Sequence, residues 1–297
     1  MSTPNGQKGA VPLFPPREKF AIPLPDGRDL HLGERTLVMG ILNITPDSFA
    51  DVRRLFDPGA AEAAAVEMEA GGADLIDVGG ESTRPGSDPV SAEEEIARIQ
   101  PVLERLSRAV RLPISVDTSK PLVAEMALDQ GAAIVNDVSG LRYDSALAEV
   151  AARHHAGLVL MHGRGLSRDM YRKASYVSVA REVTDELGAS LERALAAGVA
   201  RVSIVLDPGL GFAKRSEHSY AALVALPEFA ALGRPLLVGP SRKSFLTAAI
   251  GDRPVDDRDF ATAASVTAAV LLGAHIVRVH AVAEMVDVVR VADRIRC

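Results

Sequence analysis

The amino-acid sequence predicts an α/β protein: a (β/α)8 TIM barrel with an N-terminal β-hairpin. Short apolar runs bounded by turn residues recur along the 297 residues, and helical periodicity follows each of them. Eight such runs occur, the number that closes a parallel barrel, and their continuous Val/Ile/Leu character is typical of strands buried on both faces. The length suits one barrel, and no change of composition divides it. An open doubly wound sheet is the alternative.

The N-terminal region is expected to contain a lead-in and then a hairpin. Residues 1–18 are dense in Pro and Gly, which predicts a flexible segment, and residues 19–297 are expected to form the single barrel domain. The Asp26-Gly27 pair is a turn signal flanked by alternating residues over 20–32. We therefore expect an antiparallel hairpin ahead of the first barrel strand.

The barrel strands are expected at the apolar runs, and each run ends at a turn or a helix signal. None contains the polar alternation of a strand with one solvated face. The strands are expected at 36–42, 74–79, 113–117, 133–137, 157–161, 202–207, 235–239 and 275–279.

Helix start signals fall between these runs. Pro58 and Pro121 suit the first turn of a helix, and Ser91 with Glu94 has the spacing of a capping box. Because proline lacks the amide N–H and crowds the preceding turn, Pro101 predicts a kink or early break. Three helices are expected from these signals, at 58–71, 91–107 and 121–130.

Composition excludes several classes of protein. With 47% hydrophobic and 24% charged residues, and no apolar run near the roughly 20 residues of a membrane span, we expect a soluble globular protein without a membrane partner. The formal charge of −6 leaves no broad basic field for nucleic acid. Cys297 is the one cysteine, which excludes an intrachain disulfide or a thiolate metal cage and favours the cytoplasm.

Polar residues stand where the predicted strands end. In a parallel barrel these ends meet at one rim, which is where the active site of such a fold lies. Amide and carboxylate groups suit a polar heterocycle, whereas Lys, Arg and His favour an anion, so the set suggests a ligand with two ends. The strand-end residues are Asn43, Asp77, Asp117, Asn136, Asp137, His162, Asp207, Ser241, Arg242, Lys243, Arg278 and His280.

Chemistry divides this set between the two ends of the ligand. The carboxylates of Asp117 and Asp207 could pair with an amino-imino edge, and Asn136 supplies both donor and acceptor. Lys243 could donate to a ring oxygen. Arg278 and His280 stand two apart on one strand, so they point the same way and suit a phosphate.

Several motifs in order resemble dihydropteroate synthases. The resemblance covers about residues 36–294 and implies a (β/α)8 enzyme that joins 4-aminobenzoate to 6-hydroxymethyl-7,8-dihydropterin diphosphate, releasing diphosphate in folate synthesis. It also implies a homodimer. The motifs are Asn43-Ile-Thr-Pro-Asp-Ser-Phe49, Gly79-Gly-Glu-Ser-Thr-Arg-Pro-Gly86, Ser115-Val-Asp-Thr-Ser-Lys120, Asp207-Pro-Gly-Leu-Gly-Phe212, Ser241-Arg-Lys-Ser-Phe245 and Arg278-Val-His280.

The resemblance implies roles for individual residues. It assigns the pterin to Asp117, Asn136, Asp207 and Lys243, and the leaving diphosphate to Arg278 and His280, so that catalysis rests on Asp117, Lys243, Arg278 and His280. Asn43 is implied as the ligand of a Mg²⁺ cofactor that also contacts diphosphate. The residues implied around diphosphate and aminobenzoate are Thr83 and Arg84, with Pro85, Phe49 and Phe212 as an apolar wall and Ser241 as the contact to the aminobenzoate carboxylate.

The chain departs from the family pattern at several positions. Residues 50–53 replace a usual Gly-Gly pair, which predicts a stiffer first loop, and Ala213 and Ala281 replace a usual Gly and Asp. The loop after His162 is rearranged, which leaves the part of Met161 in the pterin pocket open. Three basic residues of that region are interpreted as a solvated loop and assigned no site: Arg164, Arg168 and Arg172.

Three other functions fit parts of the pattern. A methyltetrahydrofolate-corrinoid methyltransferase would share the pterin pocket but has no use for a diphosphate cradle. A non-catalytic pterin-binding paralogue would explain the altered residues 50–53. A Schiff-base aldolase using Lys243 is the third, and borohydride trapping with a carbonyl substrate would reveal it.

Overall fold

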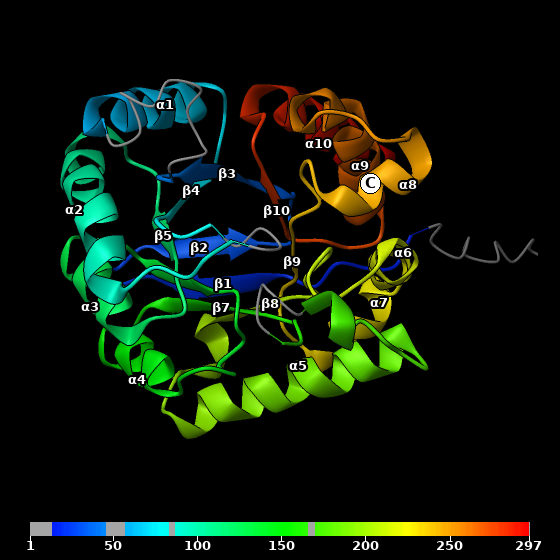
Figure 1. Ribbon diagram of the computed structural model, residues 1–297, viewed down its shortest axis with the longest axis horizontal. Coiled ribbons are helices and arrows are strands. Elements are labelled where there is room, and N and C mark those ends of the chain that lie inside the picture. The colour runs from blue at the N-terminus through cyan, green and yellow to red at the C-terminus, as the bar shows by residue number, and fades with distance from the viewer. Residues whose placement is uncertain (1–13, 46–56, 83–86, 166–169, 297) are drawn as a thin grey trace, which may run out of the picture.

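The computed structural model describes residues 14–45, 57–82, 87–165 and 170–296. Eight parallel strands form a barrel in the order β8-β7-β6-β5-β4-β3-β10-β9, and a parallel bridge between Leu206 and Leu236 joins its first and last strands (Figure 1). The predicted barrel is confirmed. Its strands are β3 (Leu37–Asn43), β4 (Leu75–Gly79), β5 (Ile114–Asp117), β6 (Ile134–Asp137), β7 (Gly157–Met161), β8 (Ile204–Asp207), β9 (Leu237–Val238) and β10 (Ile276–Val279).

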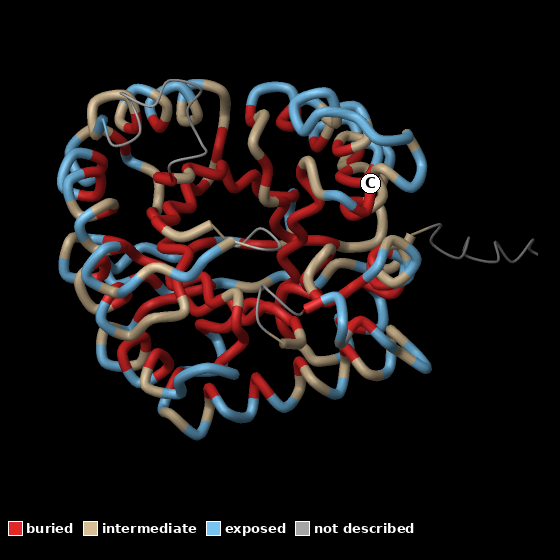
Figure 2. Tube along the Cα trace, viewed as in Figure 1, coloured by how far each residue is buried: buried red, intermediate tan, exposed pale blue. Residues whose placement is uncertain are grey.

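Helices surround the barrel, and the expected positions of the three that carried start signals agree with the structure to within two residues (Figure 1). Their inner faces are buried against the strands, whereas their outer faces are exposed (Figure 2). The helices are α1 (Pro58–Ala70), α2 (Ala92–Ala109), α3 (Pro121–Asp129), α4 (Ala146–Arg153), α5 (Val179–Ala196), α6 (Ser216–Val224), α7 (Leu226–Phe229), α8 (Thr247–Ile250), α9 (Asp259–Leu271) and α10 (Val282–Arg296).

Of the kink or early break expected at Pro101, the early break is wrong, because α2 continues through this residue to Ala109, and the kink stays a prediction. The start of the helix is as predicted, with the Ser91 hydroxyl accepting from the Glu94 amide. Ile99 and Leu103, on either side of the proline, are at most 1% exposed. Burial of such side chains contributes about 1.5–3 kcal/mol each, which offsets a proline penalty of about 3 kcal/mol.

The N-terminal hairpin closes the amino-terminal end of the barrel. Strands β1 (Phe20–Pro23) and β2 (Asp29–Leu32) pair antiparallel with Phe20 opposite Leu32, as the Asp26-Gly27 turn predicts. Ile22 packs in one cluster with residues from inside the barrel, among them Leu75, Val205 and Ile276. This end of the barrel is therefore plugged by hydrocarbon.

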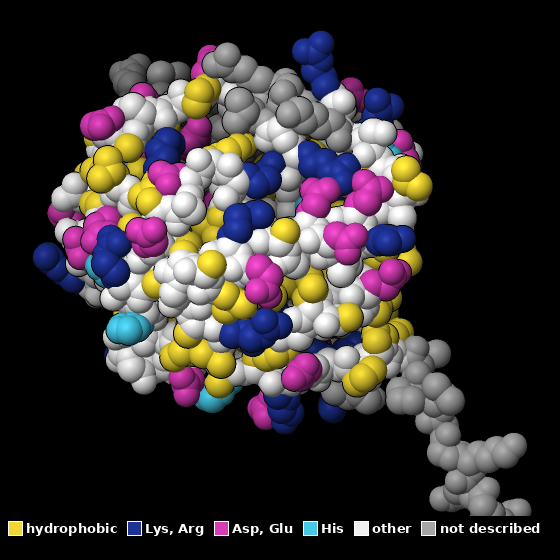
Figure 3. Space-filling view, turned by 90° about the horizontal axis from the view of Figure 1, so that it is seen from below, with side chains coloured by type: hydrophobic (Ala, Val, Ile, Leu, Met, Phe, Trp, Pro, Cys, Tyr) yellow, Lys and Arg dark blue, Asp and Glu magenta, His cyan; other side chains and the backbone are white. Residues whose placement is uncertain are grey.

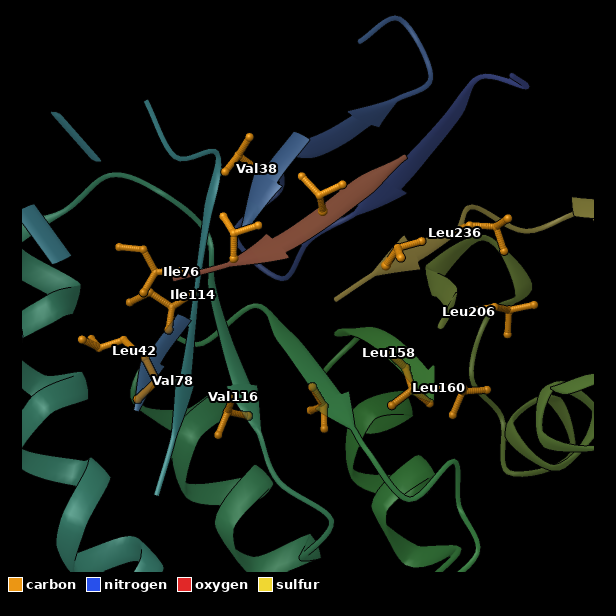
Figure 4. Packing of buried hydrophobic residues seen from close by; sticks show 14 of the residues in the cluster. Val38, Leu42, Ile76, Val78, Ile114, Val116, Leu158, Leu160, Leu206 and Leu236 are labelled. Atoms are coloured by element: carbon orange, nitrogen blue, oxygen red, sulfur yellow. The ribbon is translucent and has the colours of Figure 1, made fainter. Parts of the chain in front are cut away.

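A larger apolar cluster lies between the strands and the helices. Because strand side chains alternate, each strand contributes to the barrel interior at one residue and to this outer cluster at the next. On β3, for example, Met39 belongs to the inner cluster, whereas Val38 and Leu42 belong to the outer one. Figure 4 shows outer-cluster side chains of several strands, including Ile76, Val116, Leu160 and Leu206.

Two observations bear on the partners excluded by composition. Among the described residues, no helix is both long and apolar enough to cross a membrane. Figure 3 shows Lys and Arg interspersed with Asp and Glu on one face of the molecule, in keeping with the net charge of −6.

The boundary of the predicted lead-in stays a prediction, since residues 1–13 lie outside the described part. Arg17, near its end, donates to the Ala274 carbonyl and pairs with Asp293.

Candidate active site

A layer of polar side chains lies above the apolar plug inside the barrel. Leu75, Ile134, Val205 and Ile276 belong to the plug, and a residue two positions further along a strand points the same way. The residues at these later positions are Asp77, Asn136, Asp207 and Arg278, and Asp117 occupies the same level two residues after the buried Ser115. The strands thus carry charged groups to their carboxyl ends.

A cavity of about 400 Å³ opens at this end of the barrel. It brings together both ends of the ligand site expected from the sequence, since acidic, basic and aromatic side chains line it. The predicted residues in its wall are Asn43, Asp117, Phe212, Ser241, Arg242, Lys243, Arg278 and His280.

Other predicted residues lie behind this wall or outside the described part. Asn136 and Asp207, both assigned to the pterin, are buried but do not line the cavity, and neither do the strand-end residues Asp77, Asp137 and His162. The roles assigned to Asn136 and Asp207 remain predictions. Outside the described residues lie Phe49, Thr83, Arg84, Pro85 and the altered segment 50–53.

The Arg278 guanidinium connects two buried carboxylates. Its Nε donates to Asp77 Oδ2 at 2.6 Å and its Nη2 to Asp117 Oδ2 at 2.8 Å. Asn136 Nδ2 donates to the same Asp77 oxygen at 2.9 Å, so the amide nitrogen of Asn136 faces Asp77. Burial lowers the pKa of Arg278, but Asp77 and Asp117 outweigh this and raise it, so the guanidinium is charged. Asp77, which carried no predicted role, is the anchor of this network.

Asp117 lines the cavity and keeps an unused acceptor. Within the described residues, its buried Oδ1 has no hydrogen-bond partner, although its Oδ2 pairs with Arg278. Burial raises the pKa of Asp117 to about 7; Arg278 opposes the shift, whereas Asp77 adds to it. A buried acceptor without a donor is costly, and a ligand that donates a hydrogen bond here would remove that cost.

Lys243 lies between the acidic layer and the aromatic wall. Its Nζ donates to the Leu210 carbonyl at 2.5 Å and lies 4.5 Å from the centre of the Phe212 ring. Burial lowers the pKa of Lys243 to about 8, against the attraction of Asp207. The ammonium form therefore predominates at neutral pH and can donate into the cavity.

The other predicted basic residues have partners within the protein. The Ser241 hydroxyl lies 2.9 Å from His280 Nδ1 and accepts from the His280 amide, so these two side chains position each other. The Arg242 guanidinium donates to Asp259 and Asp256, which neutralise much of its charge. The aminobenzoate contact assigned to Ser241 stays a prediction.

The turn after β8 depends on close approach of the backbone. Gly209 has φ 67°, and its amide donates to Asp207 Oδ1 at 2.7 Å. A Cβ at Gly209 would lie 1.9 Å from the His162 carbonyl oxygen, so any other residue would displace the turn. Ala213, at the position where the family usually has glycine, also has a positive φ, 48°. The chain keeps the turn at this position at a cost in backbone strain.

Several residues of the cavity wall carried no predicted role. Glu81 lines the cavity and pairs with Lys120, which also pairs with the buried Glu95. The signal available was the Gly79–Gly86 motif, which contains Glu81. The other unassigned wall residues include Met170 and Tyr171 of the rearranged loop, Ser244, Val255 and Arg258.

The arrangement is that of a pterin-binding enzyme: a (β/α)8 barrel with a buried acidic acceptor, a lysine and a cationic rim in one cavity. The family model described as "Pterin binding enzyme" matches residues 39–280.

The comparisons narrow the class further. The chain is 43% identical over 275 residues to the dihydropteroate synthase of Synechocystis sp., covering 92% of this chain and 95% of that protein. It is 45% identical over 260 residues to that of Mycobacterium leprae, covering 86% and 91%. Among solved structures, Burkholderia cenocepacia dihydropteroate synthase complexed with 7,8-dihydropteroate matches with a TM-score of 0.83 and 40% identity over 93% of this chain and 96% of that one. The chain belongs to the dihydropteroate synthase family.

Proposed function

We propose that this protein joins 4-aminobenzoate to 6-hydroxymethyl-7,8-dihydropterin diphosphate, giving 7,8-dihydropteroate and diphosphate in folate biosynthesis. One observation carries the proposal: Asp117, which keeps an unused acceptor, lines the same cavity as Arg278 and His280, together with Phe212 and Lys243. The relatives named dihydropteroate synthase, and the complex of one of them with 7,8-dihydropteroate, support it.

The acidic layer would bind the pterin. An amino-imino edge presents N–H donors, which match a carboxylate oxygen such as Asp117 Oδ1. Lys243 would donate to the ring oxygen from the other side. The negative charge of Asp207 opposes the lowering of the Lys243 pKa by burial, and so stabilises the ammonium form of Lys243. Asn136, which holds Asp77, would act on the ring after a small rearrangement.

The basic rim would stabilise the leaving group. As the C–O bond to diphosphate breaks, the electron pair leaves with oxygen, and Arg278 and His280 meet the developing negative charge. The exocyclic methylene of the pterin becomes electron-poor, and the ring and the carboxylates below it spread that charge. The displacement would thus be dissociative.

The nucleophile needs little activation. An aromatic amine is neutral at physiological pH, so its nitrogen can form the C–N bond directly and lose one proton afterwards. Phe212 and Lys243 would contact the aminobenzoate ring, since the Lys243 Nζ lies 4.5 Å from the centre of the Phe212 ring and both residues line the cavity. By resemblance to the Yersinia pestis dihydropteroate synthase, which has been solved in complex with a sulfonamide drug, sulfonamides should compete at this position.

The donor set fits a Mg²⁺ that arrives with the diphosphate. Within the described residues there is no group of three or more His, Cys, Asp or Glu side chains suited to a metal, whereas the Asn43 amide lines the cavity. Mg²⁺ commonly keeps several waters and takes few protein ligands plus substrate phosphates. Asn43 would supply an oxygen, and the ion would neutralise diphosphate charge.

Two further expectations remain proposals. A homodimer is favoured by the family and by the apolar residues exposed on the adjacent helices α9 and α10: Phe260 is 93% exposed, and Val291 is 61% exposed. Light scattering of the wild type and of Phe260→Glu would test it, with a monomeric variant expected. A cytoplasmic location is supported by the single cysteine among 297 residues.

The decisive assay follows dihydropteroate and diphosphate with Mg²⁺, with and without 4-aminobenzoate. Formation of dihydropteroate that depends on aminobenzoate is the expected result. Tight pterin binding without product would instead identify the non-catalytic paralogue considered from the altered residues 50–53. The diphosphate cradle gives no support to the corrinoid methyltransferase.

A further inference from the structure

A fully buried lysine lies beneath the turn that carries Asp207 and Phe212. The Lys214 side chain is 1% exposed and is absent from the cavity wall. Its Nζ lies 2.7 Å from His162 Nδ1, and it donates to the carbonyls of Gly209 at 3.1 Å and Phe212 at 3.2 Å. Burial lowers the pKa of Lys214 well below its ordinary value, and the charge of Asp207 opposes this shift. In the ammonium form, Nζ has one N–H bond for each of the three acceptors.

The acceptor role of His162 follows from its other neighbour. His162 Nε2 lies 3.0 Å from Glu186 Oε2, and because a carboxylate only accepts, Nε2 carries the proton. The Nδ1 lone pair is then free for Lys214. Burial lowers the pKa of His162 to about 4, and Lys214 adds to the shift, so the imidazole is neutral at physiological pH.

The series of hydrogen bonds from Lys214 through His162 ends at Glu186 on α5. Arg164 donates to Glu186 and, at 2.8 Å, to Glu182, and its guanidinium lies 4.0 Å from the centre of the Tyr176 ring. Its side chain is 20% exposed, so the interpretation of Arg164 as part of a solvated loop is wrong. Tyr176 Oη in turn donates to the Ala213 carbonyl. The loops after β7 and β8 are thereby joined to one helix.

The Lys214 side chain holds the turn after β8 by hydrogen bonds to the backbone of that turn. It donates to the Gly209 carbonyl, while the Gly209 amide donates to Asp207 Oδ1 at 2.7 Å. It also holds the Phe212 carbonyl, and the Phe212 ring lies against Lys243 in the cavity. The turn that carries two of the residues assigned to substrate, Asp207 and Phe212, is therefore held by one buried lysine.

We propose that Lys214, held by the neutral His162, is a positioning residue for the reaction: it sets Asp207 for the pterin and Phe212 for aminobenzoate without touching either. The inference rests on the proposed function. It also implies an electrostatic effect, since burial raises the pKa of Asp207 and the cations Lys243, Lys214 and Arg278 oppose this. Loss of the Lys214 charge would make Asp207 protonate at a higher pH.

The first test compares Lys214→Met with Lys19→Met, a surface control whose side chain is 71% exposed. The probe is 6-hydroxymethylpterin without diphosphate, titrated calorimetrically across pH. Lys214→Met should bind it about 10-fold more weakly at about pH 8 and more weakly still at about pH 6, because each pKa unit changes a protonation-linked affinity tenfold. The aminobenzoate KM should rise as well, and Lys19→Met should match the wild type.

The second test uses His162 and remains informative if Lys214→Met does not fold. The Asn oxygen in His162→Asn occupies the place of Nδ1 and can still accept from Lys214, whereas His162→Gln places its amide near Nε2 and removes that acceptor. His162→Gln should therefore lose more pterin affinity than His162→Asn.

Equal losses in the two His162 variants, or a loss in Lys214→Met that is the same at every pH, would overturn the inference and leave Lys214 as a core residue only. Wild-type affinity in Lys214→Met would overturn it too. Failure of the proposed function looks different, because the wild type itself would then form no dihydropteroate.

Discussion

The two ends of the barrel are built on the same strands but have opposite chemistry. At the amino-terminal end, Leu75, Val205 and Ile276 pack with Ile22 of the hairpin. Two residues further along each of these strands stand Asp77, Asp207 and Arg278. One step of strand alternation thus separates a hydrocarbon plug from a layer of buried charge.

The difference shows where stability and function reside. Each large side chain in the plug contributes about 1.5–3 kcal/mol by burial. The charged layer costs free energy unless every group is paired, and within the described residues Oδ1 of Asp77 and Oδ1 of Asp117 have no partner. We infer that the carboxyl end is held ready for a ligand and that the hairpin end supplies stability for it.

The largest expected effect is on the charged layer. Arg278→Met should lower kcat/KM by about 10³-fold, because it removes a donor to the leaving diphosphate and leaves Asp77 and Asp117 without their cation. Initial rates of dihydropteroate formation measure it. A variant with wild-type kcat/KM would remove Arg278 from the mechanism.

A substitution in the apolar plug should lower stability and leave substrate binding unchanged. Ile22 is 1% exposed, so Ile22→Ala should lower the free energy of unfolding by about 3 kcal/mol through lost burial and a residual cavity. Urea denaturation measures the loss, and both KM values of the folded variant should stay near those of the wild type. A higher KM for pterin diphosphate would instead show that packing at the hairpin end of the barrel affects substrate binding at the carboxyl end.

The pH dependence of pterin binding sharpens the comparison. Burial raises the pKa of Asp117 to about 7, so its accepting carboxylate predominates above that pH and is lost below it. Affinity for 6-hydroxymethylpterin should fall about tenfold for each pH unit below about 7. Calorimetric titration of the wild type and of Asp117→Asn at several pH values measures this pH dependence. We expect the Asp117→Asn variant to lack it. A flat wild-type profile would argue against Asp117 as the acceptor.

The smallest effect is expected at Ala213, in the turn between Phe212 and Lys214. Ala213→Gly would relieve about 1 kcal/mol of left-handed backbone strain but lose a buried methyl group and add freedom to the unfolded chain, each worth about 0.8 kcal/mol. The free energy of unfolding should change by less than about 1 kcal/mol. The matched control is Ala65→Gly inside α1, where no strain is relieved and a clear destabilisation is expected. Equal losses in the two variants would show that Ala213 is unstrained.

The strands and their polar ends could be predicted from the sequence because both follow from local pattern. The apolar runs suffice to place Asp117 and Arg278 at the carboxyl ends of barrel strands, where these ends meet at one rim. Pro101 shows the limit, since the tertiary burial that keeps α2 continuous is not a local property.

Pairing across the barrel could not be predicted in this way. Arg278 meets Asp77 and Asp117 across 201 and 161 residues of chain. Lys214 stands in a glycine-rich turn, where a lysine is ordinarily solvated, and only the packing of the loops after β7 and β8 buries it against His162. The function of these groups depends on contacts between residues far apart in the sequence, which the spacing of motifs does not predict.

A crystal structure of the protein with Mg²⁺ and an unreactive analogue of the pterin diphosphate would test the proposed reaction most directly. We expect the amino-imino edge within hydrogen-bond distance of Asp117 Oδ1, the diphosphate beside Arg278 and His280, and the hairpin end unchanged. A pterin bound away from Asp117, or a diphosphate turned away from Arg278, would contradict the proposed reaction.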